Sequence, residues 1–310
     1  MKNRITFAPR RPLGRTGFVA TQLGIGDLAD RRIAMDELVA TARRAIDAGL
    51  NVIDTAPGYE DGYSEEIVGR AVRSVRDRTF IIDKIDHHDR PIAPQVEQSL
   101  RRLAMDHADL FVFHGLSTMD GWHRAIGPGG GLEQLEAFRK AGKTRFVGIS
   151  SHCPQVLAVA VESGRLDVVL FPIGPYVDER YIGQVLPLCR QRGVGTVCFK
   201  TFGAGKLVGD TTGYNQPLAD RPRGKVSSGG GAGEPSLPHL SVDDCLHYTL
   251  TCDPDVALLG LSFPNEQDTA LASARRFTRP LSSDQMADIR RRAVEAIAGK
   301  GKCWWNPGGV

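Results

Sequence analysis

The chain has 310 residues and a mass of 33.7 kDa, enough for two small domains or for one large α/β barrel. Its hydrophobic content of 41% is typical of a globular protein with a large core. Charged residues make up 24% of the sequence, and the formal net charge is +3. Because this charge is small and the basic residues are interleaved with acids, we expect no nucleic-acid partner.

We recognise no targeting signal in the sequence, and this indicates where the protein is located. The first residues are basic, but no apolar segment of a secretory signal follows them. No apolar run approaches the ~20 residues that a membrane span needs. We therefore expect a cytoplasmic protein without a membrane partner. The cysteines show no CxxC pair and no metal-ligand spacing, so we expect reduced thiols and no metal site. They are Cys153, Cys189, Cys198, Cys245, Cys252 and Cys303.

The N-terminal third opens with a predicted hairpin and then alternates strands with helices. Residues 5–17 are interpreted as a short hairpin that plugs the bottom of a barrel. The first strand covers 23–26, and the helix after it covers 36–49, with Asp36 as cap and Gly49 at its end. The second strand covers 50–54. The next helix, 64–75, has Ser64 as predicted N-cap and glutamates in its first turn.

The same alternation continues along the rest of the chain, and we count eight strand–helix units. Each later strand is a nearly continuous apolar run, which is typical of a parallel sheet covered on both faces. Eight such units favour a closed (β/α)8 TIM barrel over an open sheet, and we expect one domain over residues 1–310. An extra amphipathic helix is expected over 282–299. The remaining strands are predicted at 79–84, 109–114, 145–150, 167–171, 194–200 and 256–262, and the remaining helices at 93–103, 131–143, 153–164, 179–193, 241–251 and 265–274.

Two segments fall outside the repeat. Residues 203–240 form a long loop rich in Gly, Pro and Ser between the seventh strand and its helix. A loop of this length in a compact domain is either a functional flap or a solvated insertion. The tail, 300–310, follows the last helix.

Three successive predicted strands end in ionisable side chains. Asp54 follows LNVI, Lys84 follows TFIID, and His114 follows DLFVF, while Tyr59 lies five residues after Asp54. Each residue alone has a structural explanation as a cap, a solvated amine or an interior imidazole. Three buried strands that each end in a charge have no joint packing explanation. Because polar strand ends of a barrel meet at its catalytic mouth, we expect the four side chains to converge there.

These residue types make sense together as an acid–base site. A phenol normally titrates near pH ~10 and is a poor acid at neutrality. A nearby ammonium stabilises the phenolate, a carboxylate keeps that ammonium charged, and an imidazole shares a proton or orients a carbonyl oxygen. The sequence therefore predicts that Asp54 holds Lys84 and that Lys84 makes Tyr59 a better acid. The reaction that needs such a site is hydride transfer to an aldehyde or ketone.

The segments DTAPGYEDGYSEEIVG, GKTRFVGIS and RPLGRTGFVATQLGIG, together with Lys84 and His114, resemble the aldo-keto reductase superfamily over residues 11–275. The resemblance implies carbonyl reduction with NADPH by the tetrad Asp54, Tyr59, Lys84 and His114, with Tyr59 as general acid. It implies a cofactor that lies extended across the barrel without a Gly-rich dinucleotide fold.

The resemblance also implies cofactor contacts, some of them altered here. Family members usually have Ser-Asn after the fifth strand, where this chain has Ser150 and Ser151. They have Gln and Tyr at the sixth, where it has Leu170 and Ile173. An aliphatic floor or Tyr176 is the expected substitute for the stacking contact.

The phosphate end is altered as well. NADPH-preferring members hold the 2′-phosphate with an Arg, and the matching residue here is Gln267. The resemblance implies NADP as the cofactor, and the loss of this Arg leaves NAD as an alternative. Lys200 and Lys206 either meet the pyrophosphate, helped by the amides of Gly203 and Gly205, or lie in a solvated basic loop. The remaining expected cofactor contacts are Gly26, Asp27 and Ser262.

The substrate is expected to be a small or medium carbonyl compound, or the corresponding alcohol. Tyr63 lines its pocket or caps the next helix, and Trp122 and Tyr176 are further candidates. Trp304 and Trp305 either fold over the pocket mouth or pack against the last helix. The tail has one cysteine only, so the iron–sulfur cluster of one subgroup is not expected. A monomer or weak homo-oligomer is the default.

The sequence is also compatible in part with three other interpretations. GIGDLA formally matches a Rossmann fingerprint with Asp54 as a ribose ligand, but the expected helix does not follow at once. FGAGKL does not fulfil a P-loop because no Gly opens it and no Ser or Thr follows Lys206. A regulatory, cofactor-sensing protein of the same fold is the alternative to an enzyme.

Overall fold

A computed structural model describes residues 9–31, 33–211, 235–261 and 264–306. Eight parallel strands close into a barrel in the order β10-β3-β4-β5-β6-β7-β8-β9, which confirms the predicted fold class. Each strand pairs with the one before it in the chain, and β10 closes the ring on β3. The barrel strands are β3 (Leu23–Ile25), β4 (Val52–Asp54), β5 (Phe80–Ile85), β6 (Ala108–Phe113), β7 (Thr144–Ser150), β8 (Val168–Pro172), β9 (Gly195–Phe199) and β10 (Val256–Leu259).

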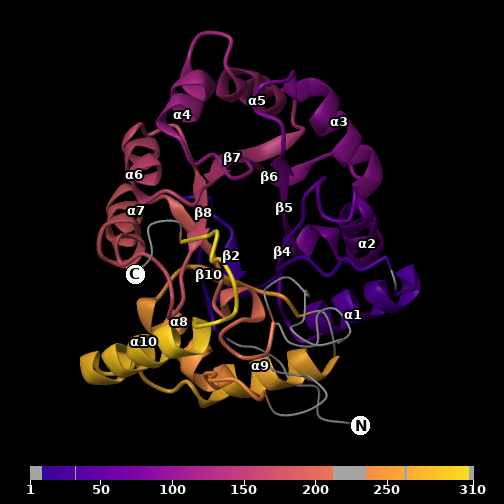
Figure 1. Cartoon of the computed structure of the whole chain (residues 1–310). Coiled ribbons are helices and arrows are strands. Elements are labelled where there is room, and N and C mark those ends of the chain that lie inside the picture. Colours follow the sequence, from indigo (N-terminus) through magenta and orange to yellow (C-terminus); the bar gives the residue numbers. More distant parts are fainter. Residues whose placement is uncertain (1–8, 32, 212–234, 262–263, 307–310) are drawn as a thin grey trace.

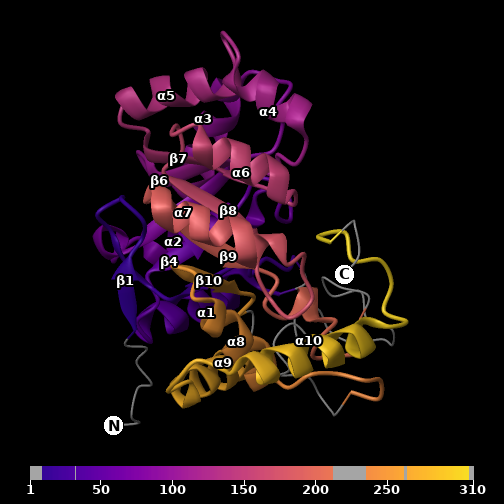
Figure 2. The same ribbon diagram turned by 90° about the vertical axis from the view of Figure 1, so that its left-hand side faces the viewer.

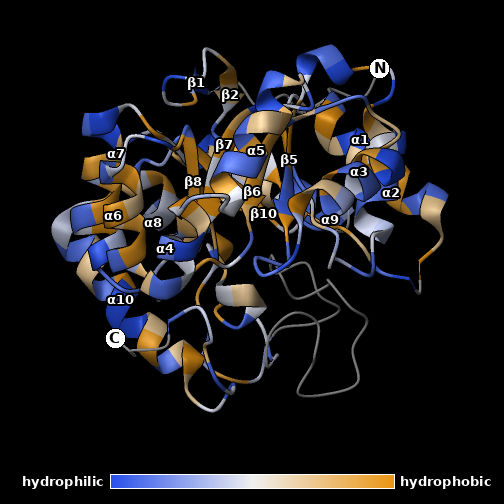
Figure 3. Cartoon of the chain, turned by 90° about the horizontal axis from the view of Figure 1, so that it is seen from above, coloured by the Kyte–Doolittle hydropathy of each residue, from blue (hydrophilic) through white to orange (hydrophobic). Residues whose placement is uncertain are grey.

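The helices surround the barrel (Figure 1). Apolar residues concentrate on the strands, and the surrounding helices carry mixed surfaces (Figure 3). The helices are α1 (Met35–Asp47), α2 (Tyr63–Val72), α3 (Ile92–Leu103), α4 (Met119–Ile126), α5 (Gly131–Lys140), α6 (Pro154–Glu162), α7 (Leu186–Arg192), α8 (Val242–Cys252), α9 (Pro264–Arg276) and α10 (Ser283–Ile297), with short turns η1 (Arg76–Arg78), η2 (Tyr181–Val185) and η3 (Gly203–Gly205). Among the helices of the described ranges, none has the length and apolar character of a bilayer span.

The strand alternation divides the core into two parts. Successive side chains of a strand point to opposite faces. On β4, Val52 belongs to the core inside the barrel and Ile53 to the core under the helices. On β5, Ile82 and Ile81 divide in the same way. The side chain two residues beyond each inward apolar residue therefore also faces inward, at the open end of the barrel.

A hairpin of β1 (Arg10–Pro12) and β2 (Val19–Thr21) closes the other end, as predicted. Leu13 and Ala20 are buried in the core inside the barrel, and the ring of Phe18 lies 5.1 Å from that of Phe80 at the start of β5. The hairpin and the C-terminal segment lie at opposite sides of the barrel (Figure 2). The hairpin thus closes the bottom of the barrel, and the opposite end, the mouth, is open.

Two local predictions were wrong. Helix α2 begins at Tyr63 with Gly62 as N-cap, because the chain enters the helix through a left-handed residue with φ of 81°. Ser64 instead accepts a hydrogen bond from the Thr55 hydroxyl at 2.9 Å. Between the strand predicted at 109–114 and the helix predicted at 131–143 lies a helix that was not predicted, α4, which the Thr118 hydroxyl caps.

The long loop after β9 is described only at its ends, and residues 212–234 of the predicted flap lie outside the described residues. Asp210 accepts hydrogen bonds from the amides of Ser236 and Leu237, and Leu240 donates its amide to the Leu207 carbonyl. These bonds join the two ends of the loop. The tail packs on this base, since the Lys300 ammonium donates to the carbonyl of Pro238.

Candidate active site

The deepest polar group at the mouth is an ion pair between neighbouring strands. The Lys84 ammonium lies 2.7 Å from both carboxylate oxygens of Asp54 and 2.7 Å from the Thr55 carbonyl oxygen. The side chains of Lys84 and Asp54 are 2% and 6% exposed. A buried charge of this kind is tolerated only when it is paired and hydrogen-bonded. Lys84 is therefore held as an ammonium in one position.

Tyr59 lies directly over this ammonium. The Lys84 nitrogen is 4.5 Å from the centroid of the Tyr59 ring. The ring of His114 meets Tyr59 edge-on, with centroids 5.8 Å apart and an interplanar angle of 84°. The structure thus brings all four predicted side chains together, from the ends of β4, β5 and β6 and from the loop after β4.

The loop that carries Tyr59 is held by its backbone. Glu60, Asp61 and Gly62 all have positive φ, of 49°, 53° and 81°. The left-handed region costs a residue other than glycine roughly 1 kcal/mol or more. Arg31 donates to the carbonyls of Glu60 and Asp61 and so holds this conformation.

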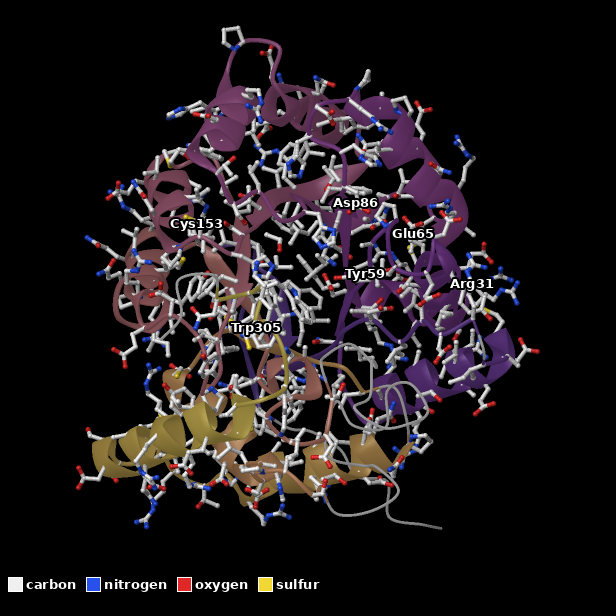
Figure 4. The ribbon with its side chains drawn as sticks, viewed as in Figure 1. Arg31, Tyr59, Glu65, Asp86, Cys153 and Trp305 are labelled. Carbon is white, nitrogen blue, oxygen red and sulfur yellow. The ribbon has the colours of Figure 1, made fainter. Side chains whose placement is uncertain are left out.

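A second carboxylate, Asp86, contacts the site from the end of β5. Its Oδ1 lies 2.5 Å from Nδ1 of His114. Burial alone raises the pKa of Asp86, but the hydrogen bond and charge of His114 outweigh it, and the pKa is lowered overall. The backbone amide of Gly58 donates to the same carboxylate. Tyr59 and Asp86 both lie inside the ring of helices (Figure 4).

A further pair of acids lies behind Lys84. Burial, and then the charge of Glu65, raises the pKa of Asp83 well above its usual value, and burial also raises the pKa of Glu65. The charged forms of both carboxyl groups are therefore disfavoured, and Arg102 lies 3.0 Å from Oε2 of Glu65. Asp54 is left as the carboxylate that balances the charge of Lys84.

The four side chains line one wall of a cavity of about 550 Å³. Its volume is in the range of small-molecule sites. The predicted site residues that line it are Gly26, Asp27, Asp54, Tyr59, Lys84, His114, Ser150, Leu170, Lys200, Gly205 and Trp304.

Several predicted cofactor residues do not reach this cavity. The side chain of Gln267 is buried between helices, where it donates to the carbonyls of Thr41 and Leu261 and accepts from Arg44. The amide group of Gln267 is therefore already hydrogen-bonded within the helix layer. The buried Lys206 ammonium donates to the Lys302 carbonyl in the tail, so it holds the tail and does not face a pyrophosphate. Ser262 lies outside the described residues.

The loop glycines and the second serine also differ from expectation. The amides of Gly203 and Gly205 donate to the carbonyls of Lys200 and Phe202 inside a tight turn, so neither is free to bind a phosphate. Ser151 is buried, and its hydroxyl accepts from the Cys153 amide. It faces the start of α6 and not the cavity.

The predicted substrate residues separate into two groups. Trp122 is buried in the core under the helices. The hydroxyl of Tyr63 donates to the Ile33 carbonyl. The Tyr176 carbonyl accepts from the buried indole of Trp305, which packs the tail down. None of these three lines the described cavity, whereas Trp304 does.

Three side chains at the site were missed: Asp86, which contacts His114, and the cavity residues His152 and Phe199. The rings of His152 and Phe199 line the cavity 5.3 Å apart. Burial, and then the charges of Lys200 and His114, lower the pKa of His152 to about 4. Its buried Nδ1 has no hydrogen-bond partner among the described residues. All three were detectable, because each lies two residues beyond an inward strand residue.

The fold and the site together define a class: a (β/α)8 barrel with an acid–base site of phenol, ammonium, carboxylate and imidazole at its strand ends. The model of the aldo/keto reductase family matches residues 20–255. The chain belongs to that family. The Rossmann alternative was wrong, because β3 is part of a closed barrel and the next helix begins only at Met35.

Curated relatives are distant. The chain is 25% identical over 234 residues to the NADH-specific methylglyoxal reductase of Escherichia coli strain K12, a match that covers 65% of this chain and 69% of that protein. It is 25% identical over 222 residues to the L-galactose dehydrogenase of Arabidopsis thaliana, covering 64% of this chain and 66% of that one. The match thus spans about two thirds of the length of these relatives.

Solved structures show the same fold. An aldo-keto reductase from Klebsiella pneumoniae in complex with NADPH superposes with a TM-score of 0.66 at 22% identity, over 91% of this chain and 93% of that one. The holo form of aldo-keto reductase AKR11C1 from Bacillus halodurans gives a TM-score of 0.66 at 23% identity, over 91% and 95%. At such identities the likeness concerns the fold alone.

Proposed function

We propose that this protein is an NAD(P)H-dependent oxidoreductase that reduces an aldehyde or ketone to an alcohol, or carries out the reverse reaction. The observation that carries the proposal is the buried Lys84 ammonium, fixed by Asp54 under the ring of Tyr59 at the wall of a cavity. This arrangement suits one task, the delivery of a proton to an oxygen on which negative charge develops.

Each member of the tetrad has a distinct role in this proposal. Tyr59 donates its proton to the substrate oxygen. Lys84 stabilises the phenolate that remains, because the two groups lie close together and the ammonium of Lys84 is buried. Asp54 keeps Lys84 charged and in place. His114 lies edge-on to the phenol and contributes to the same proton network.

The nicotinamide end of a dinucleotide fits the residues of the cavity. Ser150 and His152 offer polar atoms to a carboxamide, and the buried Nδ1 of His152 still needs a partner. Phe199 offers an aromatic face, in place of the Tyr176 contact first expected. When bound, the nicotinamide supplies the hydride in reduction or takes it in oxidation.

The phosphate end supports both cofactors. Lys200 lines the cavity and suits the pyrophosphate, and Gly26 and Asp27 also line the cavity. Gln267 offers nothing to a 2′-phosphate, because its amide is bound within the helix layer. One relative is named as NADH-specific and one similar structure holds NADPH, so the proposal covers NAD as well as NADP.

The substrate in this proposal is a small or medium carbonyl compound that the cavity admits. Trp304, which is 37% exposed at the cavity, would contact it. Since barrel strands and the tail both line the cavity, the proposal treats the chain as one domain. The proposal also includes a cytoplasmic location and a protein that is a monomer or a weak homo-oligomer.

The proposal is tested with the variant Tyr59→Phe, which removes one hydroxyl and keeps the ring over Lys84. Oxidation of NADPH and of NADH is followed with a panel of aldehydes, and cofactor binding is followed by tryptophan fluorescence. We expect kcat to fall by ~10² to 10⁴, the usual contribution of a general acid, with cofactor affinity unchanged.

The matched control is Tyr63→Phe, since Tyr63 does not line the cavity and its hydroxyl is bound to the Ile33 carbonyl. It should keep kcat within about twofold. A Tyr59→Phe protein with undiminished turnover would refute the proposed acid. A wild-type protein that binds cofactor but turns over no carbonyl would support the regulatory alternative instead.

A further inference from the structure

Asp86 contacts two parts of the site, the imidazole of His114 and the loop that carries Tyr59. One carboxylate oxygen, Oδ1, meets Nδ1 of His114 at the end of β6. The other, Oδ2, faces Gly58, whose amide donates to this carboxylate. Gly58 is the residue immediately before Tyr59. A single carboxylate at the end of β5 thus contacts both the imidazole and the loop that carries the phenol.

The contact with His114 determines where the imidazole carries its proton. A carboxylate accepts hydrogen bonds, so the Nδ1 that faces Asp86 is protonated. In the neutral ring the other nitrogen, Nε2, is then a bare acceptor. The ring of Tyr59 lies edge-on to the ring of His114, with centroids 5.8 Å apart. When His114 takes up a second proton, Asp86 stabilises the imidazolium, as a buried acid does in a catalytic triad.

We propose that Asp86 is a positioning residue that makes His114 the proton source for Tyr59. The inference rests on the proposed function. After Tyr59 has given its proton to the substrate oxygen, the Nε2–H bond of imidazolium His114 breaks and a new O–H bond forms on the phenolate. His114 is left neutral, with its proton on Nδ1 against Asp86. Its side chain is 32% exposed, so water returns the proton to Nε2.

The other charged groups near His114 do not take this role. Lys84 is committed to Asp54 and cannot accept a proton. His88 lies on the same loop as Asp86, but burial lowers its pKa, so it is a poor store of a proton. His152 faces His114 from the end of β7, and its lowered pKa keeps it neutral at pH 7. Asp86 is thus the group whose oxygen meets the His114 ring.

The test uses the variant Asp86→Asn and two measurements. In this variant the Gly58 amide still needs an acceptor, so the Asn oxygen turns to Gly58 and the Asn NH₂ group turns to His114. Nδ1 must then accept, and the proton moves to Nε2. Long-range ¹H–¹⁵N NMR of the ligand-free protein, with neutral imidazole, should show Nδ1–H in the wild type and Nε2–H in the variant.

Turnover is the second measurement. We expect kcat to fall about 10²-fold or more in Asp86→Asn with KM nearly unchanged, because the tautomer is wrong while the cavity keeps its shape. Asp86→Glu keeps a carboxylate and should recover activity to within roughly tenfold of the wild type. Asp89→Asn removes an exposed acid from the same loop and should change kcat by less than about twofold.

A second variant leaves the carboxylate in place. A Cβ at Gly58 would lie 2.7 Å from Oδ2 of Asp86, so Gly58→Ala displaces the carboxylate without removing its charge. It should lower kcat by roughly tenfold. Wild-type His114 protonated on Nε2, or an Asp86→Asn protein with wild-type kcat, would overturn the inference. An inactive wild type with Nδ1–H on His114 would refute the proposed function alone and leave the tautomer established.

Discussion

His152 shows how much one side chain of the cavity depends on its surroundings. Its imidazole is largely buried beside Phe199, and the nearby Lys200 and His114 disfavour a further positive charge. The residue is therefore neutral at pH 7 and offers a neutral nitrogen to a ligand. The sequence shows a histidine two residues after Ser150, but not the burial and the neighbouring side chains that lower its pKa.

The lowered pKa of His152 has a consequence for stability. Its pKa is about 4 in the folded protein against 6.5 for the exposed side chain, so the unfolded chain binds the proton more tightly. Stability from this group is complete above pH ~6.5 and is lost as the pH falls towards 4, by up to about 3 kcal/mol. Denaturant unfolding at pH 7 and pH 4 should show this extra loss in the wild type.

The control for this prediction is His152→Asn, which has no titrating ring. Its unfolding free energy should fall less than that of the wild type over the same pH range. Equal losses in the two proteins would show that His152 is not neutral in the folded state. The experiment uses ligand-free protein, because a bound ligand would stabilise the folded state by itself.

At the scale of elements, the alternation along each strand accounts for most of the site. Val52, Ile82 and Val112 face inward, so the residues two positions later, including Asp54 and Lys84, also do. The same rule applied one step further would have found Asp86 and His152. The prediction did not extend past Lys84 and Ser150, so it missed the inward-facing positions that follow them.

The hairpin β1–β2 offers a test at this scale. Leu13 is fully buried in the core inside the barrel, whereas Val19, on the same hairpin, is 50% exposed. Leu13→Ala should destabilise the protein by about 2–5 kcal/mol, since it leaves a cavity at the barrel bottom. Val19→Ala should cost less than about 1 kcal/mol. Urea unfolding of the two variants compares them directly.

Similar losses of stability in the two hairpin variants would show that the hairpin does not plug the barrel.

The positions of helices were less predictable than those of strands. Gln267 and Trp122 lie on helices whose rotation about their own axes depends on tertiary packing. That rotation turns the amide of Gln267 towards α1 and the indole of Trp122 into the core.

At the scale of the whole molecule, the C-terminal tail completes the cavity from a distance. Lys300 donates to the carbonyls of Lys206 and Pro238, and Lys206 donates back to the Lys302 carbonyl. Burial lowers the pKa of both Lys206 and Lys300. These contacts and the buried Trp305 hold the tail so that Trp304 lies at the cavity.

The adjacent tryptophans of the tail should behave differently when they are removed. Trp305 is fully buried and donates to the Tyr176 carbonyl, so Trp305→Ala should release the tail and increase amide hydrogen exchange over residues 300–306. Trp304→Ala should leave that exchange unchanged. Both variants should raise the substrate KM several-fold, because both remove Trp304 from the cavity.

Protection of residues 300–306 that survives Trp305→Ala would show that the lysine contacts suffice to hold the tail. An unchanged KM in Trp304→Ala would exclude Trp304 from the substrate site. The contacts that hold the tail thus determine whether Trp304 lies at the cavity.

The barrel and the tetrad could be predicted from the order of the residues alone. Both follow from local rules: apolar runs at regular intervals, a side-chain period of two along each strand, and charged residues at strand ends. Tertiary structure alone decided the rest of the site. Whether Asp86 meets His114, whether Gln267 is free, and which tail tryptophan reaches the cavity depend on contacts between segments far apart in the chain. Such contacts depend on packing and burial, which the spacing of residues along the chain does not reveal.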